Sequence, residues 1–104
     1  MQKTMPHSKL SNLNAAELSK ANTLIRAIAH PLRVKILNYI GQNQPTNVNS
    51  IYKELKLDQS ITSQHLRILK DANVLLSTRK GKEIFYEVSV AYLSTVMMIL
   101  KQYF

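Results

Sequence analysis

The chain has 104 residues, which suits a single domain, and 14 Lys and Arg against 6 Asp and Glu give it a formal net charge of +8. This excess favours nucleic acid or an acidic protein as partner over an anionic membrane, because no apolar run approaches the ~20 residues of a spanning helix. The absence of cysteine excludes disulfides, thiolate metal sites and thiol redox sensing.

The amino-terminal stretch, residues 1–12, mixes Lys, Ser, Asn and Pro without periodicity and predicts a flexible arm. It has no apolar segment after its lysine, so we expect neither a signal peptide nor an anchor, and we expect a cytoplasmic protein. Residues 13–104 are predicted to form one domain. Asn14 followed by Glu17 predicts a capping box, and apolar residues at helical spacing extend that helix to about Ala29.

The second helix is predicted to begin at His30-Pro31, because proline fits a first helical turn but not a helix interior. Its buried stripe should comprise Leu32, Ile36, Leu37 and Ile40. Arg33 and Lys35 should point away from the core. Gly41 should end the helix, and residues 41–47 are expected to be a non-regular loop.

Residues 48–74 predict two short amphipathic helices, 51–55 and 61–69, joined by a tight turn. Asn49 is the expected cap of the first, and Asp58 or Ser60 of the second. The second should bury Ile61, His65 or Leu66, Ile68 and Leu69. Its other face carries short polar and cationic side chains that suit a DNA major groove: Gln59, Ser60, Thr62, Ser63, Gln64, Arg67 and Lys70. Several of these are mediocre helix formers, which stability alone would not favour.

A β-hairpin is predicted next, with strands at residues 74–79 and 83–89 and a tip at Lys80-Gly81-Lys82. A hairpin that follows such a helix is a wing. The three cations of the tip, Arg79, Lys80 and Lys82, are placed to straddle a nucleic-acid backbone.

The last helix, residues 90–104, has a stripe of Val90, Leu93, Met97, Leu100 and Phe104, yet it is apolar around most of its circumference. One core can cover one face only, so the surplus predicts a symmetric homodimer. The candidate interface residues lie on the first and last helices: Leu18, Ile25, Leu93, Val96, Met97 and Leu100.

Three segments together resemble the ArsR/SmtB family of bacterial winged-helix repressors over about residues 20–103: AHPLRVKIL, VNSIYKELKLDQSITSQHLRILKDANVL and RKGKEIFYEV. The most specific part is the run from Gln59 to Leu69. The resemblance implies a mainly α winged helix-turn-helix fold, with four helices, a β-hairpin and a fifth helix. It also implies a homodimer through the first and last helices, and binding of double-stranded DNA. The family's DNA-contacting positions fall on Gln59, Ser60, Ser63, Gln64, Arg79, Lys80 and Lys82.

The chain departs from the metal-sensing members of that family. A cysteine pair of the third helix corresponds here to residues 49–52, which are Asn, Ser, Ile and Tyr, and residues 90–104 contain no Asp, Glu or His. His7, His30 and His65 form no metal-ligand spacing. His65 is expected to pack or to touch phosphate, and His30 to cap a helix. We therefore expect no metal and no cofactor, and the inducing signal stays open.

No nucleophile elbow, phosphate loop or paired acidic cluster indicates an enzyme. Two functions therefore remain. The first is a sequence-specific regulator, most simply a dimeric repressor that binds an inverted-repeat operator. The alternative is a winged-helix protein-interaction module without an operator of its own.

Overall fold

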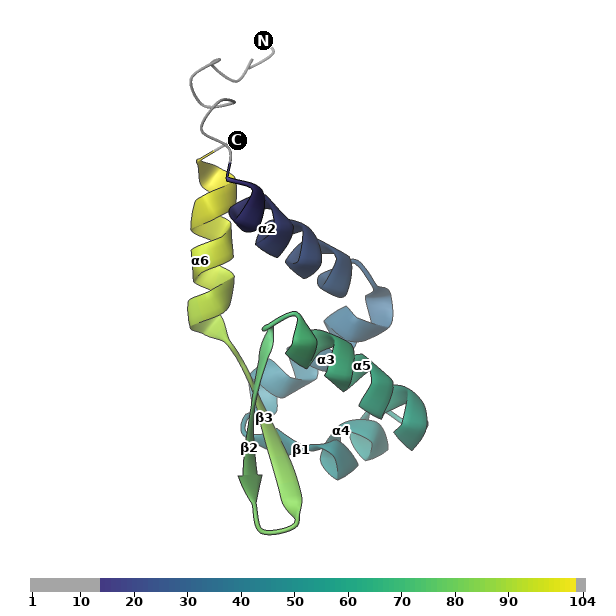
Figure 1. Cartoon of the computed structure of the whole chain (residues 1–104). Coiled ribbons are helices and arrows are strands. Elements are labelled where there is room, and N and C mark those ends of the chain that lie inside the picture. Colours follow the sequence, from purple (N-terminus) through teal and green to yellow (C-terminus); the bar gives the residue numbers. More distant parts are fainter. Residues whose placement is uncertain (1–13, 103–104) are drawn as a thin grey trace.

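The computed structural model describes residues 14–102. The predicted arm, His7, Tyr103 and Phe104 lie outside the described residues. The helices are α2 (Ala15–Ile28), α3 (Pro31–Asn43), α4 (Val48–Glu54), α5 (Gln59–Asp71) and α6 (Val90–Lys101), and the strands are β1 (Thr46–Asn47), β2 (Leu75–Lys80) and β3 (Glu83–Val88). The predicted mainly helical winged helix-turn-helix fold is confirmed. In Figure 1, the start of α2 lies beside the end of α6, and the two helices diverge from there toward the body formed by the other elements.

The first two helices begin where the sequence predicts. The Asn14 side chain accepts hydrogen bonds from the backbone N–H of Ala16 (2.8 Å) and Glu17 (3.3 Å). His30 caps α3, since its Nδ1 accepts a hydrogen bond from the N–H of Leu32 at 3.2 Å. These side chains satisfy donors that the first turn of a helix leaves unpaired.

Helix α3 runs two residues beyond the predicted stop at Gly41. Gln44 then adopts an extended ψ of 143°, the conformation favoured before a proline, and Pro45 follows. The steric demand of Pro45, rather than the flexibility of Gly41, therefore ends the helix.

Part of the predicted loop 41–47 is a strand. β1 pairs antiparallel with β3, with Thr46 opposite Tyr86 and Asn47 opposite Phe85, so the sheet has the order β1-β3-β2. The Gln44 side chain extends this edge, because its Oε1 accepts a hydrogen bond from the N–H of Val88 at 2.9 Å. A two-residue strand is too short to show a sequence period, so pairing with a distant strand defines it.

Arg33 does not point away from the core as predicted. Its Nη1 donates hydrogen bonds to the carbonyl oxygens of Ala27 (3.0 Å) and Arg26 (3.4 Å) in the last turn of α2. The last carbonyls of a helix lack partners within it, and a cation beside them is favoured. Arg33 therefore ties the start of α3 to the end of α2.

The core lies where α3, α4, α5 and the sheet meet, and it continues between α2 and α6. The side chains with at most 1% exposure are Ile36, Ile40, Ile51, Leu66, Leu69, Val74, Val96 and Thr62. Helix α6 buries Val96 and Ile99, whereas Val90 and Met97 of the predicted stripe are 63% and 52% exposed. The stripe predicted for this helix is therefore only partly right, because Leu93 and Leu100 pack against the core whereas Val90 and Met97 face outward.

Candidate nucleic-acid interface

A tight turn sets the angle between α4 and α5. Asn47, not Asn49 as predicted, caps α4, since its side chain accepts a hydrogen bond from the N–H of Ser50 at 2.9 Å. Lys56 then takes a left-handed backbone conformation with φ of 55°. Asp58 caps α5 by accepting hydrogen bonds from the N–H groups of Ser60 (2.8 Å) and Ile61 (3.2 Å). The helix-turn-helix is thus fixed by local hydrogen bonds at both helix starts.

Helix α5 exposes a polar face and buries Thr62, Leu66 and Leu69. The exposed residues include six of the seven side chains predicted for the DNA-facing side of this helix: Gln59, Ser60, Ser63, Gln64, Arg67 and Lys70. The seventh assignment is wrong, because Thr62 is completely buried and its Oγ1 donates a hydrogen bond to the carbonyl of Asp58 at 2.8 Å. This local bond satisfies the hydroxyl inside the core. Ile61 and Ile68, predicted to be buried, are 46% and 41% exposed.

His65 packs on His30, with ring centroids 4.9 Å apart and planes inclined by 55°. Burial, then the nearby His30 and Arg33 charges, lowers the pKa of His65 below its usual 6.5. The imidazole is therefore mainly neutral at pH 7. Of its two predicted roles, packing fits this position better than a contact to phosphate.

The wing, β2 and β3, places all three predicted cations in solvent. Gly81 turns the tip with φ of 64°, which a residue without Cβ adopts readily. Arg79 Nε donates to the carbonyl of Gly81 at 3.3 Å, and Lys80 Nζ lies 5.7 Å from the centroid of the Phe85 ring. Lys82 stands on the other side of the turn.

The wing and α5 share one cleft of about 290 Å³. Ser63 of α5 and Lys82 of the wing, both predicted DNA contacts, lie in its wall. Asn49, which was predicted to cap α4, is exposed at the start of α4 and lines the same cleft. It was not among the predicted DNA contacts, although its amide side chain beside a predicted helix-turn-helix could have indicated one. The complete lining is Asn47, Val48, Asn49, Ser63, Lys82, Glu83, Ile84 and Tyr86.

The predicted dimer residues separate into three groups. Leu18 and Ile25 of α2 are 41% and 47% exposed and lie seven residues apart, hence on one face, and Met97 of α6 is also exposed. Leu93 and Leu100 are partly buried against the core. The assignment of Val96 to the dimer interface is wrong, since its side chain is completely buried within the protomer.

Within residues 14–102, no three His, Cys, Asp or Glu side chains gather where they could hold a metal ion. None of the helices in this range is both long and apolar enough to cross a membrane.

Comparison with known proteins identifies the family. Residues 30–76, from His30 through the start of β2, match the model of the bacterial regulatory protein, arsR family. The chain is 36% identical to the transcriptional repressor PagR of Bacillus anthracis over 77 residues, which span 74% of this chain and 77% of PagR. It is 33% identical to the repressor SmtB of Mycobacterium tuberculosis over 81 residues, covering 78% of this chain and 59% of SmtB.

Solved structures agree with the fold. The crystal structure of PagR aligns with a TM-score of 0.70 and 32% identity over 83% of this chain and 99% of PagR. A homodimeric winged helix-turn-helix DNA-binding domain from Mycobacterium bovis aligns with a TM-score of 0.71 and 21% identity over 84% of this chain and 80% of that domain. The resemblance stated from the sequence is confirmed: the chain belongs to the ArsR/SmtB family of DNA-binding transcriptional regulators.

Proposed function

We propose that this protein is a dimeric repressor that recognises an inverted-repeat operator through α5 and the wing, without a metal or thiol signal. The observation that carries the proposal is the shared cleft, which joins Ser63 of α5 to Lys82 of the wing. A groove-facing helix and a phosphate-facing hairpin must lie side by side if both are to engage one duplex.

The two elements divide the contacts by chemistry. The exposed face of α5 offers amide and hydroxyl groups at Gln59, Ser60, Ser63 and Gln64, which can hydrogen-bond to base edges in a major groove. Arg67 on the same helix and the wing cations can reach phosphate oxygens. Phosphate contacts position a protein, whereas base contacts specify the sequence.

The dimer is proposed to close through α2 and α6. Exposed apolar side chains lie on both helices, at Leu18, Ile25, Met97 and Met98. The adjoining ends of these helices, the start of α2 and the end of α6, project away from the helix-turn-helix (Figure 1), so a second copy could pack there without covering α5. The Mycobacterium bovis domain, which shares this fold and is homodimeric, supports a dimeric state.

Repression is proposed because PagR and SmtB are both repressors. A dimer bound to a promoter in the cytoplasm would exclude polymerase. The chain has no cysteine, and residues 90–104 have no Asp, Glu or His, so we propose that zinc, cadmium and arsenite do not change its DNA affinity. Isothermal titration that showed tight stoichiometric zinc binding coupled to DNA affinity would contradict this part.

Operator geometry provides the test. DNA that co-purifies with the protein is sequenced, and the enriched duplex is footprinted. Two copies of α5 related by a two-fold axis reach one face of a duplex only if their half-sites are about one turn, ~34 Å, or a multiple of it apart. An insertion of about five base pairs between half-sites should abolish tight binding, whereas about ten should preserve part of it. Direct repeats, or indifference to the half-turn insertion, would refute the proposed dimer geometry.

A further inference from the structure

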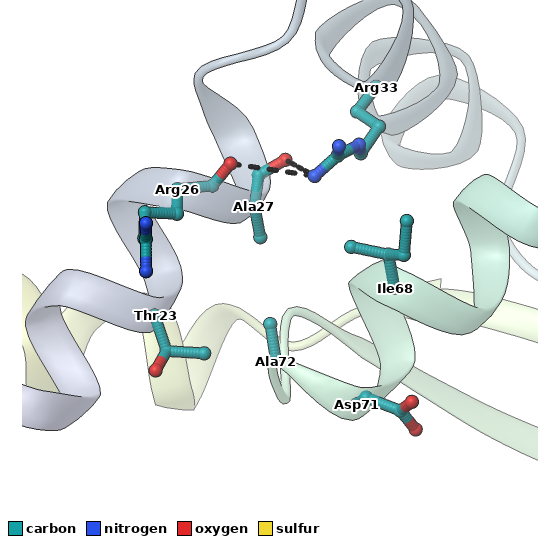
Figure 2. A pocket seen from close by; sticks show the side chains of 7 residues that line it. All are labelled: Thr23, Arg26, Ala27, Arg33, Ile68, Asp71 and Ala72. Atoms are coloured by element: carbon teal, nitrogen blue, oxygen red, sulfur yellow. Dashed lines mark hydrogen bonds between the residues drawn. The ribbon is translucent and has the colours of Figure 1, made fainter.

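A second cleft, of about 410 Å³, lies between the C-terminal half of α2, the start of α3 and the C-terminal half of α5. It is drawn in Figure 2, and its lining residues are Thr23, Arg26, Ala27, Arg33, Ile68, Asp71 and Ala72. It shares no residue with the cleft beside the wing. Its volume lies within the range of about 300–1,000 Å³ that is typical of small-molecule sites.

Two arginines line this cleft. Arg33 is held in place by the hydrogen bonds of its Nη1 to the α2 carbonyls, and its Nε is buried without a hydrogen-bond partner among the described residues. Arg26 also lines the cleft, but in Figure 2 its guanidinium points away from that of Arg33. In the same view the carboxylate of Asp71 points away from Arg33. A partly buried cation with an unpaired donor favours an anion beside it.

The remaining lining is apolar. Ala27 and Ala72 are each 3% exposed, and Ile68 is a large aliphatic side chain left 41% exposed beside them. Capping of α2 explains one nitrogen of Arg33, but it explains neither the unpaired Nε of Arg33 nor the exposed Ile68. An anionic head with an apolar body would match both kinds of lining.

We propose that this cleft binds a small carboxylate with an apolar body, and that its occupancy changes the affinity of the protein for DNA. Ile68 and Asp71 belong to the same helix as the proposed base-reading residues, Ala72 is the C-cap of that helix, and α2 belongs to the proposed dimer. A ligand wedged between them would set the separation of α5 from the dimer helices. Such a ligand changes the DNA affinity only if it binds one separation of these helices more tightly than another. DNA must then change the affinity for the ligand by the same factor.

The ligand-binding part of this inference stands on the cleft alone, whereas the regulatory part rests on the proposed function. Benzoate is the probe, and benzamide is its neutral counterpart of nearly the same shape. In an NMR titration of the full-length ¹⁵N-labelled protein, benzoate should shift amides of residues 23–27 and 68–72 saturably. Benzamide should bind about tenfold more weakly, as expected when a charge-assisted hydrogen bond is lost.

Three variants make the titration specific. Arg33→Gln should weaken benzoate binding about tenfold, and Ile68→Glu, which places a carboxylate in the lining, should weaken it at least as much. Lys20→Gln removes a charge from α2 outside the cleft and should bind benzoate like the wild type. Arg33→Gln also loses the bonds to the end of α2, so its thermal unfolding is measured. If that variant does not fold, Ile68→Glu decides the question.

Absence of saturable shifts at about 10 mM benzoate, a concentration at which a site with Kd of ~1 mM is mostly filled, would overturn the site. Equal binding of benzamide, or shifts confined to the wing cleft, would do the same. Fluorescence anisotropy of the enriched duplex, with sodium chloride matched to sodium benzoate, then tests regulation. Benzoate that binds without changing DNA affinity overturns the regulatory part alone. If no duplex binds, the proposed function fails while the NMR result still decides the ligand site.

Discussion

Helices α5 and α6 have nearly equal lengths, 13 and 12 residues, but opposite outer faces. Each buries a narrow stripe, Leu66 and Leu69 in α5 and Val96 and Ile99 in α6. Outside that stripe α5 presents mainly amides, hydroxyls and cations, with Ile61 and Ile68 at 46% and 41% exposure, whereas α6 presents Met97 and Met98 at 52% and 66% exposure. The buried faces are chemically alike, so the outer face distinguishes a helix suited to a polyanion from one suited to another protein.

The two helices also begin differently. Asp58 caps α5 with two hydrogen bonds, while Ser89, at the start of α6, makes no side-chain cap bond. A helix that must hold side chains in a groove benefits from a rigid first turn. A helix that packs along its length gains its stability from buried surface instead.

Adjacent residues of α6 should give the largest contrast. Val96→Glu places an unpaired charge in the core and should cost more than about 4 kcal/mol, so circular dichroism should report an unfolded chain. Met97→Glu should leave a folded protomer but a monomer by light scattering at micromolar concentration, whereas Met97→Leu should remain dimeric. A wild-type monomer, or a dimeric Met97→Glu, would show that the exposed face of α6 is not the interface.

On α5 the exposed face should govern affinity for DNA rather than stability. Ser63→Ala and Gln64→Ala should each cost ~1–3 kcal/mol of operator binding and relax discrimination between sites. Their free energies of unfolding, measured in urea, should stay within about 0.5 kcal/mol of the wild-type value, because both side chains are exposed. Lys35→Gln, an exposed change on α3, serves as the control in anisotropy titrations. Unchanged discrimination in both α5 variants would mean that other residues read the bases.

The caps provide a smaller contrast. Asp58→Ala should lower the free energy of unfolding by ~1 kcal/mol, because two N–H groups of α5 lose their acceptor. Ser89→Ala should cost less than about 0.5 kcal/mol, since no cap bond is lost. Chemical denaturation of both variants measures the difference. Equal losses would indicate that the α5 cap contributes little to the fold.

The wing should act through charge alone. Lys80→Gln and Lys82→Gln should weaken all duplexes similarly, and each should flatten the slope of log affinity against log salt by ~0.9 per phosphate contact removed. Anisotropy titrations at several salt concentrations, with operator and random duplexes, supply the slopes. If either substitution altered base preference, the wing would be reading sequence.

The smallest expected effect concerns pH. The pKa of His65 is lowered in the folded protein, so the unfolded chain binds more protons there as the pH falls below about 6.5. Stability should therefore be fully retained above that value and should decline on acidification toward the folded pKa. His65→Gln should reduce this decline in stability. The midpoint urea concentration of unfolding, measured at several pH values, tests this. An identical pH dependence in the variant would assign the decline to other groups.

Much of the fold could be predicted because its signals are local. Asn14, His30-Pro31 and Asp58 mark helix starts, and Lys80-Gly81-Lys82 marks the turn of the wing. Each acts on backbone groups within a few residues, so the sequence alone reveals it. The same holds for the exposed amides and hydroxyls of α5, whose residue types are unusual for a helix selected only for stability.

The tertiary structure decided which side of each helix is covered. Thr62 faces the core, where its hydroxyl bonds the carbonyl of Asp58. Arg33 turns inward to the end of α2, and Val96 fills the core although neighbouring residues are equally apolar. Strand β1 and both clefts depend on residues far apart in the chain. Periodicity fixes the spacing of a buried stripe, but where that stripe lies depends on the helix or strand that packs against it, because burial is a property of the contact between two surfaces.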